Sequence, residues 1–354
     1  MIRYDAGFIC RGVALLALLL LGGCSSISYF GQLASGQLQL LHERQPVSSI
    51  IADPNSDPKL RDHLIKSQQA RVFASSHLHL PDNQSYRLYV DIGRPYVVWN
   101  VFATEEFSLD AINHCFPIAG CVAYRGYYKP GDARGEAALQ RLAGKDVYLS
   151  GVETYSTLGW FDDPIISSML TWGDERVAAL IFHELAHQRF YVKDDSEFNE
   201  SYANFVEQEG GRQWRAERGL APEKVSDATQ RDQFTQMVLD TRDRLQKLYA
   251  EPLPPTEMRA RKAAEFERLR NDYRQLRDSQ WAGDHRYDRW IDAPMNNAKL
   301  LPFGLYDQWV PSFAALYKQV GGDWPAFFSA VEKLGGLPEV ERKAALRKLA
   351  APSA

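Results

Sequence analysis

The sequence has little net charge, few cysteines and no internal repeat or low-complexity tract, and each absence narrows the possible classes of protein. Its 354 residues include 41 basic and 45 acidic side chains, a formal net charge of −4. So mild a charge argues against a nucleic-acid partner. The length suits one large or two ordinary domains, and a hydrophobic content of 45% is enough for a real core.

The apolar stretch Val13–Leu21 is too short to cross a membrane comfortably, so a long apolar run is also missing. It follows two arginines and ends in Gly22-Gly23-Cys24-Ser25, a pattern that looks like a bacterial lipobox. Residues 1–23 are therefore expected to be a cleaved signal peptide, with Cys24 as a lipidated N-terminus anchored in a membrane. An ordinary signal peptide and a single anchor helix are the alternatives.

The four cysteines have separate expected fates. Cys10 is removed with the signal peptide and Cys24 carries lipid. By resemblance to Gram-negative lipoproteins, Ser25 after the lipidated cysteine implies the outer membrane, with the protein facing the periplasm. Cys115 and Cys121 are then in an oxidising compartment, where a disulfide closing a small loop is expected. Their alternative role is to bind a metal together with His114.

One stretch indicates specific chemistry: His183-Glu184-Leu185-Ala186-His187, which follows the apolar run Val177–Phe182. On a helix the two imidazoles lie one turn apart on one face and can bind one divalent metal ion, most often zinc. Glu184 can reach a water on that metal and take its proton. The alternative is a buried helix with two hydrogen-bonded histidines.

A second helix is predicted to start after Ser196 as N-cap and to reach residue 207. A carboxylate one turn into this helix can fold back to the same metal. Zinc would then have three protein ligands and one open position for water, which is the arrangement of catalytic sites.

These residues resemble a known class of enzyme. His183-Glu184-x-x-His187 followed by Asn199-Glu200-Ser201-Tyr202-Ala203 looks like a gluzincin metallopeptidase, which implies Glu200 as the third ligand of one Zn²⁺ per chain. In many gluzincins the residue four positions after that glutamate is an aspartate that orients a zinc histidine. Here it is Asn204, which can accept the hydrogen bond but adds no charge.

The resemblance extends to a bacterial aminopeptidase family. The strings Gly120–Tyr127 and Tyr155–Trp160 look like that family, as does the metal motif with the residues around it. The resemblance covers most of the chain after the signal peptide. It implies an α+β, zincin-like fold and hydrolysis of peptides, and leaves the substrate open.

The periodicity predicts a small mixed sheet beside a mostly helical body within one domain, residues 24–354. Strand-forming runs lie at residues 86–91, 96–102, 121–124 and 146–150. Helical patterns lie at 27–80, with breaks near 46 and 53–58, and at 135–142, 230–249 and 256–280. The last two, separated by a proline-rich tip, predict an antiparallel helical hairpin at about residues 223–282. It is a solvated surface pair or a surface for a protein partner.

Substrate contacts are assigned to a few further residues. Glu153 is a candidate to bind the free amine of a peptide, and Tyr155–Trp160 is a candidate edge strand for an extended peptide. Tyr306 is preferred over His285 as the group that stabilises the oxyanion. The alternatives are a solvated charge at Glu153, an ordinary core strand at Tyr155–Trp160 and core packing at Tyr306.

Together these features predict a zinc-dependent peptidase in the cell envelope that removes N-terminal residues from peptides. One alternative is a zinc endopeptidase that acts on envelope proteins, since both activities use the same metal centre. Another is a non-catalytic lipoprotein that binds a partner through the helical hairpin.

Overall fold

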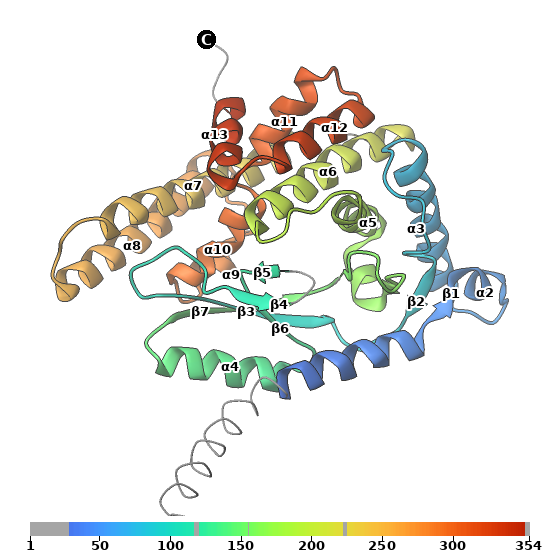
Figure 1. The fold of residues 1–354 in the computed structure, drawn as a ribbon, viewed down its shortest axis with the longest axis horizontal. Coiled ribbons are helices and arrows are strands. Elements are labelled where there is room, and N and C mark those ends of the chain that lie inside the picture. The colour runs from blue at the N-terminus through green and yellow to red at the C-terminus, as the bar shows by residue number, and fades with distance from the viewer. Residues whose placement is uncertain (1–27, 117–119, 155, 222–224, 351–354) are drawn as a thin grey trace, which may run out of the picture.

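The computed structural model describes residues 28–116, 120–154, 156–221 and 225–350 of an α+β protein (Figure 1). Its largest antiparallel sheet has the strand order β6-β3-β7, with β3 (Val98–Thr104) between β6 (Arg125–Tyr127) and β7 (Asp146–Val152). The expected α+β class is therefore confirmed. Cys24 and the expected signal peptide lie outside the described residues.

The two faces of this sheet pack against different helices because side chains alternate along each strand. Val101 and Ala103 of β3 point to one face, where they meet helical residues 28–43 and α4 (Pro130–Leu142). Phe102, between them, points to the other face and packs against α10 (Asn297–Tyr306). In Figure 1 the sheet lies between α4, below it, and α5 (Asp174–Arg189), which carries the histidine motif.

Two smaller sheets complete the β structure of the described residues. Strands β1 (Gln45–Pro46), β2 (Leu88–Val90) and β8 (Ile165–Ile166) form one, and β4 (His114–Phe116) pairs with β5 (Gly120–Val122) in the other. Cys115 and Cys121 face each other across this last pair and are joined by a disulfide. Of the run expected as one strand at 121–124, only Cys121 and Val122 lie in β5, and Ala123 and Tyr124 connect β5 to β6.

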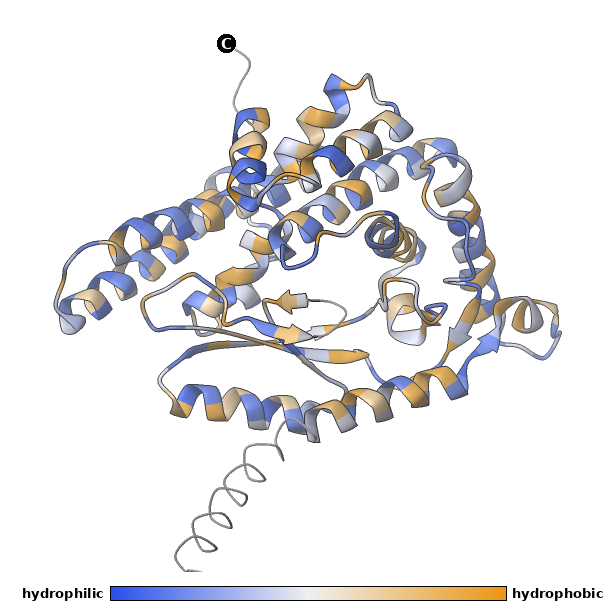
Figure 2. Cartoon of the chain, in the orientation of Figure 1, coloured by the Kyte–Doolittle hydropathy of each residue, from blue (hydrophilic) through white to orange (hydrophobic). Residues whose placement is uncertain are grey.

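The main core is built around α5 (Asp174–Arg189) and α6 (Ser196–Glu217). Helix α5 is seen end-on at the centre of the molecule and carries both hydrophobic and hydrophilic residues (Figure 2). The remaining helices around this core are α2 (Val47–Ala52), α3 (Pro58–Ser76), η1 (Ser167–Trp172), α11 (Val310–Gln319), α12 (Trp324–Gly335) and α13 (Glu339–Ala350).

The N-terminus of α6 is tied to the end of the chain. Its N-cap is Asp195, one residue before the expected Ser196, and the Asp195 carboxylate accepts a hydrogen bond from the backbone N–H of Phe198. Arg342 of α13 forms a buried ion pair with the same carboxylate at 2.6 Å. The guanidinium of Arg342 thus offsets the cost of burying the Asp195 charge.

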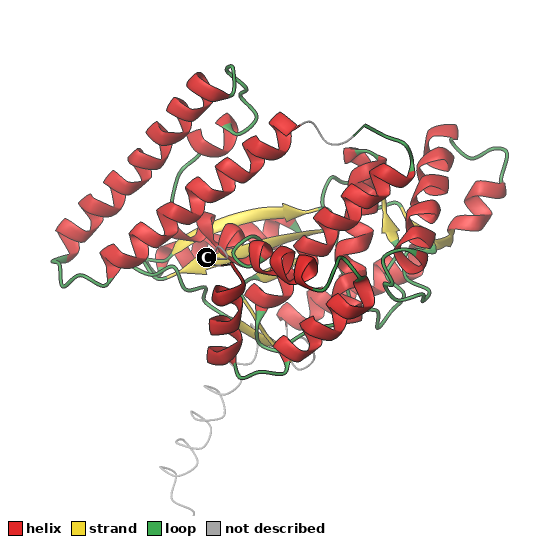
Figure 3. Cartoon of the chain, turned by 90° about the horizontal axis from the view of Figure 1, so that it is seen from above, coloured by secondary structure: helices red, strands yellow, loops and turns green. Residues whose placement is uncertain are grey.

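Helices α7 (Val225–Tyr249) and α8 (Pro255–Gln280) run side by side in opposite directions and project from the body (Figures 1 and 3). Arg244 contacts Glu265 at 2.7 Å and Gln233 contacts Gln280 at 3.1 Å, which fixes this orientation. Their apolar faces meet each other and the short helix α9 (Asp288–Asp292) in a separate hydrophobic cluster. Among the described residues, no helix combines the length and the apolar character needed to span a membrane.

Candidate metal centre

Helix α5 places both histidines of the motif in the protein interior. It begins after Gly173, whose φ of 88° favours glycine, and has Asp174 and Glu175 in its first turn. The apolar run Val177–Phe182 holds the following turn in the core. His183, Glu184 and His187 are each less than 10% exposed.

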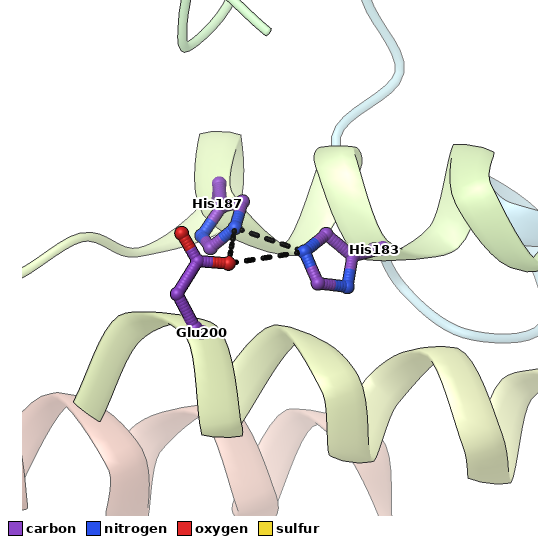
Figure 4. A group of neighbouring side chains, drawn as sticks. All are labelled: His183, His187 and Glu200. Atoms are coloured by element: carbon purple, nitrogen blue, oxygen red, sulfur yellow. Dashed lines mark hydrogen bonds and ion pairs between the residues drawn. The ribbon is translucent and has the colours of Figure 1, made fainter. Parts of the chain in front are cut away.

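Glu200 of α6 completes a tight triangle with the two histidines (Figure 4). The Nε2 atoms of His183 and His187 lie 3.2 Å apart, and each lies 3.4 Å from Oε2 of Glu200. Ligands held about 2.0–2.1 Å from a tetrahedral metal ion are about 3.3 Å from each other. The three atoms therefore have the spacing of three corners of such a site, and the group could hold a metal ion.

A second carboxylate supports the triangle from behind. Oε2 of Glu207 lies 3.0 Å from Nδ1 of His183, and Arg176 of α5 forms an ion pair with Glu207. Glu200 and Glu207 are seven residues apart, so they lie two turns apart on one face of α6. A carboxylate at Nδ1 keeps the opposite ring nitrogen of the histidine directed at the metal position.

Glu207 occupies the place that the sequence had suggested for Asn204. The side-chain amide of Asn204 donates instead to the backbone carbonyl of Tyr306 and to Asp307, both at 2.9 Å. Asn204 therefore fixes the end of α10 against α6. Glu207 had no assigned role, and only its place beside the family-like metal motif hinted at one.

The charges around the histidines favour a bound cation. Burial alone would lower the pKa of His183, but its contacts with Glu200 and Glu207 raise that pKa to about 10. Burial opposes ionisation of both glutamates, yet the histidines hold the pKa of Glu200 at about 2, and His183 with Arg176 does the same for Glu207. When a metal ion takes the place of the imidazole proton, the carboxylates leave the cluster with negative charge, which suits a divalent ion.

Glu184 is buried beside the triangle and interacts electrostatically with its three members. Burial raises the pKa of its carboxyl group above the ordinary value, while His183 and His187 act in the opposite direction. A carboxyl group with a raised pKa can both take and return a proton near neutral pH.

Two tyrosines line the site from the side of the sheet and α10. The ring of Tyr306 stacks on that of His183 with centroids 6.2 Å apart. Burial raises the pKa of Tyr306 and Tyr124 well above the ordinary value, and Glu200 adds to the shift in both. Both hydroxyls are therefore protonated at neutral pH and can donate a hydrogen bond. Tyr124 had no assigned role, and only its place in the family-like string Gly120–Tyr127 hinted at one.

Among the described residues, neither His285 nor the Glu153 carboxylate forms a hydrogen bond or ion pair with the triangle. His285 is exposed and contacts Asp288 at 2.6 Å, beyond the end of α8. Glu153 follows β7. Burial raises the pKa of its carboxyl group, the charge of Arg176 lowers that pKa, and the charge of Glu207 raises it. The charged neighbours of Glu153 are thus Arg176 and Glu207, the ion pair that lies behind His183. Tyr155 lies outside the described residues.

The expected edge strand at Tyr155–Trp160 was wrong for residues 156–160, which form a turn that includes Gly159 at a φ of 81°. The buried carboxylate of Asp163 explains this difference. It accepts hydrogen bonds from the hydroxyl of Thr157 at 2.7 Å and from its backbone N–H at 3.1 Å. Such local bonds compete with strand pairing. The side-chain amide of Gln188 on α5 also donates a hydrogen bond to Asp163, at 3.4 Å, so the turn contacts the helix that carries the histidines.

A cavity of about 620 Å³ lies next to the two tyrosines and is separate from the candidate metal centre. Its lining includes Ala123 and Leu305, the residues before the two tyrosines, and Arg242 of α7. None of the three candidate ligands lines it.

Comparison with known proteins assigns the chain to a family. Residues 28–346 match the family described as "Putative aminopeptidase", and the chain belongs to that family. The family name indicates a peptidase, and the expected relation to an aminopeptidase family is confirmed. Searches of curated proteins and of solved structures found no significant match.

Proposed function

We propose that this protein is a zincin-like, zinc-dependent peptidase that removes N-terminal residues from peptides in the cell envelope. The triangle of His183, His187 and Glu200 supports this proposal most strongly, because its spacing suits a three-ligand catalytic zinc site. Membership in the aminopeptidase family supports the reaction class.

The residues of the site have complementary roles in this reaction. A bound zinc ion would supply a Lewis acid that polarises a carbonyl group and lowers the pKa of water. Glu184 accepts the proton of the attacking water and passes it to the leaving amine. The Tyr306 hydroxyl donates to the carbonyl oxygen as negative charge develops there. Glu207 keeps the ring of His183 in place.

A peptide library tests the proposed activity. We expect the purified protein to contain about one zinc per chain, and a chelator to abolish hydrolysis, because the three ligands leave one position for water. Mass spectrometry should show products shortened from the N-terminus. Internal cleavage of N-acetylated peptides would contradict the aminopeptidase assignment and favour the endopeptidase. A metal-free protein that cleaves no peptide would contradict both and leave a binding role.

The contributions of Glu207 and Asn204 to zinc affinity can be measured separately. We expect Glu207→Gln to weaken zinc binding by about 10–100-fold, the usual effect of losing a group that orients a ligand. Asn204→Ala should change zinc affinity much less, because its amide bonds to Tyr306 and Asp307 and not to a histidine. Zinc affinity is measured by competition with a chelating dye.

The matched control for this comparison is Glu209→Gln on the same helix, since Glu209 is as little exposed as Glu207 but pairs with Arg212 and with none of the candidate ligands. An equal loss of affinity in Asn204→Ala and Glu207→Gln would show that the assignment of roles on α6 is wrong.

A further inference from the structure

The two helices on the outer face of the main sheet expose large apolar side chains. Helical residues 28–43 and α4 pack on the same hydrophobic cluster, through Tyr29 on one helix and Ala133 and Ala137 on the other. Their outer surfaces expose Phe30 by 47%, Leu38 by 64%, Leu139 by 65% and Leu142 by 85%. In Figures 1 and 2 both helices lie along the lower side of the molecule, with no described segment beyond them.

The charges of this face differ from those of the whole chain. No aspartate, glutamate, lysine or arginine occurs from residue 12 to residue 42, so the first helix is uncharged over most of its length. The exposed charged residues on and beside α4 are the basic residues Lys129, Arg134 and Arg141 and the acidic residue Asp132. Among the described residues these three basic side chains form no ion pair. The α4 face is thus basic, although the chain as a whole is acidic.

The covalent chain also keeps this face close to any membrane that holds the N-terminal apolar run. Leu21 ends that run and residue 28 begins the described structure, seven residues later. Seven residues reach at most about 25 Å when fully extended. The start of the exposed apolar face therefore cannot lie far from the bilayer, whether Cys24 carries lipid or the run itself is inserted.

We propose that residues 28–43 and α4 form a docking face for the surface of an anionic phospholipid bilayer. Leu139 and Leu142 enter the headgroup region and Arg134 and Arg141 contact lipid phosphates, as in other basic amphipathic helices at interfaces. The candidate metal centre lies on the opposite side of the sheet, so docking turns it away from the bilayer (Figure 1).

Side-chain footprinting of the full chain in vesicles tests this docking. Leu142 and Val340 are 85% and 81% exposed, and Val340 lies on the distant helix α13, so they form a matched pair in one molecule. The protein is reconstituted in vesicles of phosphatidylethanolamine and phosphatidylglycerol and labelled with hydroxyl radicals, with each rate normalised to the unfolded chain. We expect Leu142 to be labelled at least about fivefold less than Val340, because lipid replaces water around it.

A charge-reversed variant separates docking from simple nearness to the bilayer. Arg134→Glu combined with Arg141→Glu keeps the anchor and the apolar side chains but repels anionic lipid. Labelling of Leu142 in this variant should rise to that of Val340. Equal labelling of the two residues in the unaltered chain would overturn the proposal, and so would protection of Leu142 that survives both charge reversals.

Discussion

Replacing Glu184 with glutamine should leave zinc bound and lower kcat by about 10²–10⁴-fold, the usual contribution of a positioned acid-base group. Glutamine has nearly the same shape, and the three candidate ligands are other residues, so the metal site keeps its geometry. The buried amide cannot accept the proton of the attacking water. Steady-state kinetics and metal analysis of the same preparation measure the two effects separately.

The matched control is Glu175→Gln on the same helix, because Glu175 is about half exposed and pairs with Arg215 at the surface. This control should retain full activity and full zinc content. Full activity in Glu184→Gln would refute the proposed role. Loss of zinc from Glu184→Gln would instead show that the carboxylate helps to hold the metal.

Replacing Tyr306 with phenylalanine should lower kcat by about 10²–10³-fold, the cost of losing one donor to a developing oxyanion. The ring that stacks on His183 remains, so substrate affinity and zinc content should change little. The expected pattern is therefore a fall in kcat with an almost constant KM.

Tyr317→Phe serves as the control, since that hydroxyl contacts Gln213 of α6 and not the candidate ligands. If Tyr306→Phe keeps its kcat, the hydroxyl of Tyr306 has no role in the reaction. Tyr124→Phe then tests the other buried tyrosine of the site, whose pKa is also raised by Glu200.

Much of the metal centre could be predicted from helical spacing. Two histidines one turn apart lie on the same face of a helix whatever surrounds that helix. A short connection lets a carboxylate of the next helix return to this face, and the resemblance to gluzincins singled out Glu200. The structure places Oε2 of Glu200 3.4 Å from the Nε2 atoms of both histidines. The general α+β organisation followed from equally local patterns.

The supporting contacts depend on tertiary packing, which local patterns do not encode. Asn204 and Glu207 are both on the same side of α6, and the angle between α5 and α6 decides which of them reaches His183. The residues before Trp160 have strand-forming character, but one buried carboxylate, Asp163, captures Thr157 and turns the chain. The first outcome depends on how two helices pack, and the second depends on the burial of the Asp163 carboxylate, which is 1% exposed.

The buried pair of Asp195 and Arg342 has a consequence for the stability of the candidate site. The first turn of the helix that carries Glu200 is paired with a residue 147 positions further along the chain. Loss of α13 would leave the buried Asp195 carboxylate without its charge partner and would destabilise that turn. The position of Glu200 therefore depends on a contact between segments that are far apart in the sequence.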